Sequence, residues 1–142
     1  IITGLILIGT MLLRPGDRTT EELTPTDAGL IGLGQSFALI PGVSRSGMTI
    51  SAGLARGMGR VEAARFAFLL GIPVIAGAGL LSVVRAISDG SGITAATVVG
   101  MVVAAVTGYA AIAFLLRVIA KAGLAPFGIY CIVFGGIALA AL

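Results

Sequence analysis

The stretch that decides the fold of this chain is Pro41-Gly42-Val43-Ser44-Arg45-Ser46-Gly47, a polar turn set between two apolar runs. Pro41 and Gly42 break the run that precedes them. As a helix, residues 27–40 would reach only about 21 Å, less than the roughly 30 Å of a bilayer's hydrocarbon core. Residues 48–57 are shorter still. Two half-length helices around a polar turn are typical of a discontinuous membrane element, so we expect residues 27–57 to form a re-entrant helical hairpin.

The composition around this turn is that of a membrane protein. Of the 142 residues, 58% are hydrophobic and 11% are charged, and the mean hydropathy is +1.15. Soluble domains carry roughly a quarter charged residues, so this chain has too few charges to cover a globule. The basic residues are scattered between apolar blocks with little aromatic interleaving, which argues against nucleic-acid binding. We expect an all-α integral membrane protein.

Further apolar runs predict transmembrane helices. Residues 1–13 read as the end of such a helix, stopped at Arg14-Pro15-Gly16, and we expect the chain to be part of a larger protein. Pro73 should kink the next helix. Cys131, the single cysteine, is interpreted as a small buried hydrophobe. The three remaining predicted spans are 66–84, 93–116 and 126–142.

The positive charges predict the orientation. If residues 27–57 return to the face they came from, one face carries seven basic residues and the other carries one, with Arg45 inside the membrane. A full crossing would divide them five to three. Because Lys and Arg in short loops mark the cytoplasmic side, the re-entrant arrangement is favoured, with basic loops in the cytoplasm and the C-terminus outside. The seven are Arg14, Arg18, Arg56, Arg60, Arg65, Arg117 and Lys121, and the one is Arg85.

Arg45 points to an anion. A charge at membrane depth is costly unless it faces a polar cavity or a partner. Serines and glycines flank Arg45 in the sequence, and its guanidinium can donate hydrogen bonds to two oxygens of a phosphate. The alternative is that Arg45 pairs with a carboxylate and only holds helices together. The turn is neither a nucleophile elbow, since Ser46 replaces the last glycine and no strand precedes it, nor a Walker loop, since no Gly-Lys-Ser/Thr follows.

The rest of the turn supplies further contacts for a phosphate. Ser44 or Ser46 can cap the helix that begins near Gly47, whose free N–H groups and dipole favour an anion. Gly42 and Gly47 let the backbone bend and approach a ligand. The hydroxyl of Thr49 can face the same spot.

Two other helix starts carry no such site. Thr24 or Thr26 can cap the helix before the turn. Glu62 is interpreted as a partner of its helix dipole or as an i,i+3 partner of Arg65. The chain contains no histidine and so lacks the commonest general base.

The sequence resembles the second signature region of the undecaprenyl-diphosphate phosphatases, the BacA/UppP family of bacterial inner-membrane enzymes. The resemblance lies in Gln35-Ser36, in the run 41–50 and in the run 63–73. The likeness covers the whole chain as the family's C-terminal half. It implies two inverted repeats, each with a re-entrant helix pair. It also implies removal of the terminal phosphate of undecaprenyl diphosphate, which recycles the lipid carrier for peptidoglycan and cell-wall synthesis, supports cell shape and confers bacitracin resistance.

The same resemblance implies the roles of individual residues. Arg45 would clamp the diphosphate and stabilise charge on the transferring phosphoryl group. A serine would either attack phosphorus or only bind it, and binding is favoured because this chain offers no base to activate a hydroxyl. The candidate catalytic residues are Arg45 and Ser44, and the candidate phosphate-binding residues are Gly42, Ser46, Gly47 and Thr49.

The family's other signature, a glutamate-rich stretch with Ser-Ser and His, is absent from this sequence. We therefore expect the ligands of a divalent cation, Mg²⁺ or Ca²⁺, in a missing N-terminal half, with no metal site here and no turnover by this segment alone. The expected partners are a polyprenyl diphosphate, membrane lipids, the missing half and a second copy in a homodimer. A transporter or flippase for a phosphate-bearing lipid is the alternative, since broken helices also hold anionic substrates there.

Overall fold

The computed structural model describes residues 1–13, 16–90 and 92–140. Within these ranges all regular elements are helices, with one isolated bridge between Arg18 and Met58, so the all-α prediction is confirmed. The predicted helix stop at Arg14-Pro15 and the end of the last predicted span, 141–142, lie outside the described residues. In chain order the elements are α1 (Ile2–Gly9), η1 (Thr10–Leu12), η2 (Thr20–Glu22), α2 (Pro25–Ser36), η3 (Phe37–Leu39), α3 (Arg45–Ala55), α4 (Arg60–Ser88), α5 (Ala95–Ala122) and α6 (Ala125–Ala140).

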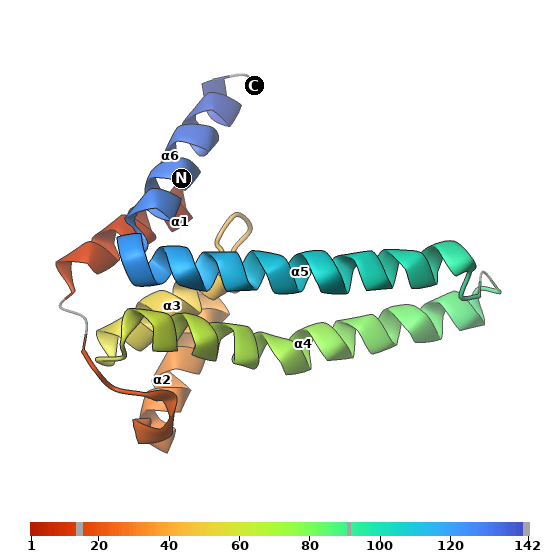
Figure 1. The fold of residues 1–142 in the computed structure, drawn as a ribbon, viewed down its shortest axis with the longest axis horizontal. Coiled ribbons are helices and arrows are strands. Elements are labelled where there is room, and N and C mark those ends of the chain that lie inside the picture. Colours follow the sequence, from red (N-terminus) through yellow and green to blue (C-terminus); the bar gives the residue numbers. More distant parts are fainter. Residues whose placement is uncertain (14–15, 91, 141–142) are drawn as a thin grey trace.

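Helices α4 and α5 lie side by side and form a long arm (Figure 1). Both are long and apolar enough to cross a membrane. Large apolar side chains along them are exposed in this chain, with Ile75 and Val99 each 62% accessible. α4 bends near its middle, where Pro73 removes a backbone donor (Figure 1). The arm therefore presents an apolar surface suited to lipid or to further protein.

Both arm helices extend beyond the apolar runs that the sequence marks. α4 begins at Arg60, six residues before the predicted span, because arginine, glutamate and alanine form helix readily. Glu62 lies in its first turn and pairs with Arg65 at 3.0 Å, which confirms the predicted i,i+3 pair. An apolar run thus marks the part of a helix suited to lipid rather than the whole helix.

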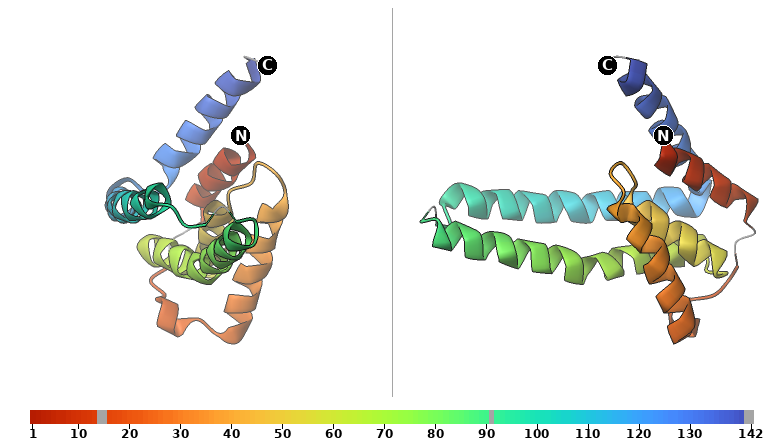
Figure 2. Two further views of the ribbon diagram at one scale, coloured as in Figure 1. Left: turned by 90° about the vertical axis from the view of Figure 1, so that its right-hand side faces the viewer. Right: turned by 180° about the vertical axis from the view of Figure 1, so that it is seen from behind.

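Helices α2 and α3 pack against each other in opposite directions (Figure 2). Thr24 is the cap of α2, accepting a hydrogen bond from the N–H of Asp27 at 3.2 Å, and Pro25 occupies the first turn. After α2 and the short η3, no helix covers residues 40–44, and α3 starts at Arg45. We call residues 40–44 together with the first turn of α3 the tip.

A carboxylate joins the two helices at the end opposite the tip. Asp27, whose side chain is 3% exposed, accepts hydrogen bonds from Arg18 at 2.8 Å and from Arg56 at 2.7 Å. These bonds, first that of Arg18 and then that of Arg56, together with those of Thr24, hold the pKa of Asp27 well below its usual range. Arg18 also donates to the carbonyl of Arg56. This base cluster ties the linker, α2 and α3 together.

Helix α3 lies at the centre of the packed part of the molecule, between α1, α2 and α4. α1 and α6 pack closely and run away from the arm (Figure 2). A Cβ added at Gly4 would lie 2.7 Å from the carbonyl of Gly128, so only glycine fits at this contact. The buried apolar residues are Leu7, Ile31, Ile50, Leu54, Met58, Ala63, Ala64, Ala67, Ile119 and Leu124.

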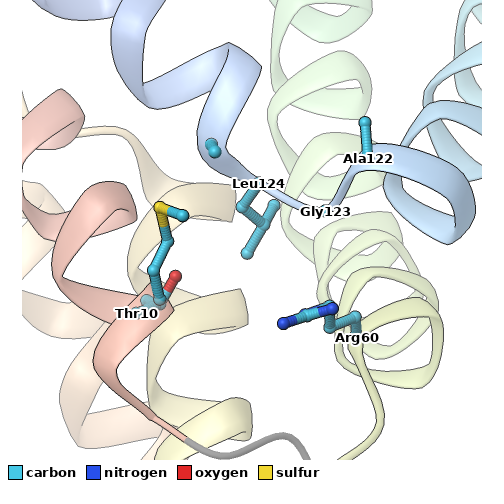
Figure 3. A pocket seen from close by; sticks show the side chains of 7 residues that line it. Thr10, Arg60, Ala122, Gly123 and Leu124 are labelled. Atoms are coloured by element: carbon cyan, nitrogen blue, oxygen red, sulfur yellow. The ribbon is translucent and has the colours of Figure 1, made fainter.

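The turn between α5 and α6 packs against the start of α4 and the end of α1. Gly123 forms this turn with a φ of +69°. A cavity of about 60 Å³ lies there, and Figure 3 shows the side chain of Arg60 reaching into the space between α4 and Thr10. It is lined by none of the tip residues.

Candidate functional site

The tip turns the chain from α2 into α3. Gly42 has a φ of +87°, a conformation that disfavours any other residue. Ser44 is extended and caps α3, its hydroxyl accepting a hydrogen bond from the N–H of Gly47 at 3.2 Å. Of the two predicted caps, the structure therefore selects Ser44, and α3 begins at Arg45 rather than near Gly47.

The cap leaves two backbone donors at the start of α3. The N–H of Gly47 bonds to the hydroxyl of Ser44, and the N–H of Met48 bonds to the carbonyl of Ser44 at 3.0 Å. The N–H groups of Arg45 and Ser46 have no acceptor among the described residues. Free N–H groups at a helix start, together with the helix dipole, favour an anion.

The guanidinium of Arg45 lies against α4. A Cβ built on Gly71 would be 3.1 Å from Nη2 of Arg45, so the guanidinium occupies the space that a side chain there would need. Within the described ranges the guanidinium makes neither an ion pair nor a hydrogen bond. The alternative of an ion pair with a carboxylate therefore finds no support within this part of the protein.

Arg45 stands between two cavities of unlike surroundings. One, of about 380 Å³, is bounded by α3, α4 and α5, and its wall is apolar apart from Arg45 and Ser46. The other, of about 280 Å³, lies beside the end of α2. The first is lined by Arg45, Ser46, Ala67, Phe68, Gly71, Ile75 and Ile112, and the second by Gly32, Gln35, Ser36, Ala38, Leu39, Arg45 and Val74.

The remaining predicted residues take different places. Ser46 lies at the tip, with its hydroxyl 3.4 Å from that of Ser44. Gly47, in the first turn of α3, is buried. Thr49 is 1% exposed and faces α2, where its hydroxyl lies 2.9 Å from Oε1 of Gln35 and 3.0 Å from the carbonyl of Arg45. The hydroxyl of Thr49 thus links the two helices, and its contact with a phosphate stays a prediction.

Sequence reasoning missed two residues that shape the site. Thr3, on α1, bonds to the backbone of the tip. Gly71, on α4, leaves room for the guanidinium of Arg45. Gly71 lies within the signature run 63–73, and that run could have drawn attention to it. Nothing in the sequence near Thr3 indicates its contact with residues about forty positions away.

The carboxylates in the described part of the chain do not gather into a metal site. Asp27 is engaged by two arginines, and Glu62 by Arg65. Across residues 1–13, 16–90 and 92–140, no three His, Cys, Asp or Glu side chains gather where they could hold a metal ion. The residues described here therefore do not fit the divalent cation that the family resemblance implies.

The model of the family described as "Bacitracin resistance protein BacA" matches residues 1–137. The chain belongs to the BacA family. The undecaprenyl-diphosphatase of Pelobacter propionicus is 47% identical over 121 residues, which cover 84% of this chain and 44% of that protein. The undecaprenyl-diphosphatase of Nocardioides sp. is 43% identical over 141 residues, covering 98% of this chain and 51% of that protein.

The chain spans about half the length of the curated relatives it matches. Family membership and the apolar arm of α4 and α5 together identify it as part of a membrane protein. The tip and its arginine lie well inside the matched region.

Proposed function

We propose that the intact protein removes the terminal phosphate from undecaprenyl diphosphate and so recycles the lipid carrier for cell-wall synthesis. The observation that carries this proposal is the guanidinium of Arg45, which has no partner among the described residues and lies on the helix whose first N–H groups are free. The relatives named undecaprenyl-diphosphatase support the reaction. A transporter of phosphate-bearing lipid is not favoured, because those relatives carry a hydrolase name.

The surroundings of Arg45 suit a lipid diphosphate better than free phosphate. Its guanidinium borders a cavity of about 380 Å³ whose other walls include Phe68, Ile75 and Ile112. A ligand that places an anion at Arg45 meets apolar surface immediately beyond it. An isoprenoid chain attached to the phosphate would gain from burying its own apolar surface there.

The residues of this chain bind and orient the phosphate in this proposal. Arg45 clamps two phosphate oxygens and stabilises the charge that develops on the transferring phosphoryl group. The N–H groups of Arg45 and Ser46 hold a third oxygen. Ser44 acts as the helix cap rather than as a nucleophile, because its hydroxyl already accepts the N–H of Gly47 and has no base beside it among the described side chains.

The half of the protein outside this chain supplies the acid–base groups and the ligands of a divalent cation, Mg²⁺ or Ca²⁺, in this proposal. The described carboxylates support this division, since Asp27 and Glu62 are both occupied by arginines. The two halves would then form inverted repeats, each with one hairpin, and this chain alone would bind phosphate without turning over.

We also propose that the hairpin of α2 and α3 is re-entrant. Gly71, which touches Arg45, follows the start of α4 by eleven residues, or about 16 Å of helix, close to half of the roughly 30 Å hydrocarbon core. The base cluster of Asp27 and Arg56 keeps both ends of the hairpin at the face where α4 begins. In the bacterial inner membrane that face would be cytoplasmic and the C-terminus periplasmic.

The release of inorganic phosphate from a polyprenyl diphosphate by the intact purified protein, with and without a chelator, tests the proposal. We expect metal-dependent release in the wild type and none in Arg45→Ala. Arg45→Lys should recover little, because lysine cannot make the bidentate contact. Arg85→Ala is the matched control, since Arg85 lies in the last turn of α4, far from the tip. Normal turnover by Arg45→Ala overturns the proposal.

A further inference from the structure

A single hydroxyl from α1 makes two hydrogen bonds to the backbone of the tip. Oγ1 of Thr3 donates to the carbonyl of Gly42 at 3.2 Å and accepts from the N–H of Ser44 at 3.0 Å. Thr3 is buried, and its methyl group would lie 3.2 Å from a Cβ added at Gly47. Thr3 therefore holds both Ser44, which caps α3, and Gly42, which has a positive φ.

Two other capped helices, η2 and α2, begin near the base cluster, and there the backbone N–H of the capping residue has a different kind of acceptor. The N–H of Thr19, which caps η2, donates to the carboxylate of Glu22 at 2.7 Å. The N–H of Thr24, which caps α2, donates to the carboxylate of Asp27 at 3.1 Å. In both, an acidic residue three positions on accepts the N–H of the cap, which is the usual capping box.

Helix α3 departs from this pattern. The position three residues after Ser44 is Gly47, which has no side chain to accept the N–H of the cap. Thr3 supplies the acceptor from another helix, and the acceptor is neutral. A carboxylate in its place would set a negative charge beside the free N–H groups of the tip and would repel a phosphate or attract the guanidinium of Arg45.

We propose that Thr3 is a positioning residue, which fixes the tip in its anion-binding conformation without adding negative charge to the site. The inference rests on the proposed function, because it assumes that the tip binds phosphate. The packing of the fold fixes Thr3 in place, because the close contact of Gly4 with Gly128 holds α1 against α6. Thr3 also lines a cavity of about 190 Å³ behind the tip, together with Ser44, Ser46 and Gly47.

The affinity of the intact protein for inorganic phosphate, measured by calorimetry, tests this role in a series of variants. Thr3→Val keeps the shape and removes the hydroxyl, and should weaken binding about tenfold because two backbone groups lose their partner. Thr3→Ser should restore wild-type affinity. Thr3→Asp keeps an acceptor of similar size and should bind phosphate more weakly than Thr3→Val.

The matched control is Thr10→Val. Thr10 is also buried and directly follows α1, but its hydroxyl donates to the carbonyl of Leu7 in α1 and not to the tip. A Thr3→Val affinity equal to that of Thr10→Val overturns the role of Thr3, as does unimpaired binding by Thr3→Asp. A wild type that binds phosphate but releases none from a polyprenyl diphosphate overturns the proposed function instead, and leaves the comparison of the variants valid.

Discussion

Replacing Gly71 with alanine tests whether the guanidinium of Arg45 lies where its function requires. The new Cβ would be 3.1 Å from Nη2 of Arg45 and 3.7 Å from Cζ. Because non-bonded heavy atoms pack at about 3.5–4.0 Å, the guanidinium would have to retreat by roughly 0.6 Å. A valine at Gly71 would add two methyl groups near the same place and displace it further.

The expected loss follows from the displacement. Misplacing a catalytic group by about 1 Å costs about 100-fold in rate, so we expect about a tenfold loss of kcat/KM in Gly71→Ala and about 100-fold in Gly71→Val. Alanine favours helix over glycine by about 1 kcal/mol, so the thermal stability of Gly71→Ala should hold while its activity falls.

Phosphate release and thermal unfolding of the intact protein should be measured together, with Gly77→Ala as the matched control. Gly77 lies on the same helix, and a Cβ there would meet nothing within 4 Å. Gly77→Ala should gain the same helix propensity and keep full activity. Equal kcat/KM for Gly71→Ala and Gly77→Ala would refute the idea that Arg45 acts from its place beside α4.

Three further predictions concern the hairpin. The pKa of Asp27 is lower in the folded protein than in the unfolded chain. The stability that its carboxylate gives is therefore present above the unfolded pKa of about 4 and is lost as the pH falls further. In thermal unfolding, Asp27→Asn should make the melting temperature less dependent on pH in this acid range. Thr49→Val should lower the free energy of unfolding by about 1–3 kcal/mol, since Gln35 loses its buried partner, and Thr49→Ser should recover it; equal denaturation curves for Val and wild type would contradict this. Cysteines placed at the exposed positions Thr26 and Ala55 should react with an impermeant reagent from one side of the membrane, and labelling from opposite sides would exclude a re-entrant hairpin.

The turn at the tip could be predicted from the sequence, because it depends on neighbouring residues. Pro41 and Gly42 stop a helix, and a serine before an apolar run can cap one, so the turn and the helix after it follow from neighbouring residues alone. The position of Arg45 in that turn predicted an anion site, because a charged side chain among apolar runs is costly unless it has a partner or faces a polar cavity. These inferences needed no knowledge of which helices meet.

Contacts between distant segments could not be predicted in this way. The base cluster joins Asp27 to an arginine 29 positions on, and Thr3 meets a backbone group 41 positions on. Hydrophobic periodicity shows which residues share a helix face, but it does not show which helix packs there. For the same reason the sequence could not show that the hydroxyl of Thr49 lies 2.9 Å from Oε1 of Gln35 across the hairpin.

Both proposals require the tip to hold a phosphate between the guanidinium of Arg45 and the free N–H groups at the start of α3. An experimental structure of the intact protein soaked with tungstate, a heavy mimic of phosphate, would show whether it does. We expect anomalous density within hydrogen-bonding distance of that guanidinium and of the N–H of Ser46. Tungstate bound elsewhere, with the tip empty and Arg45 paired to a carboxylate, would contradict it.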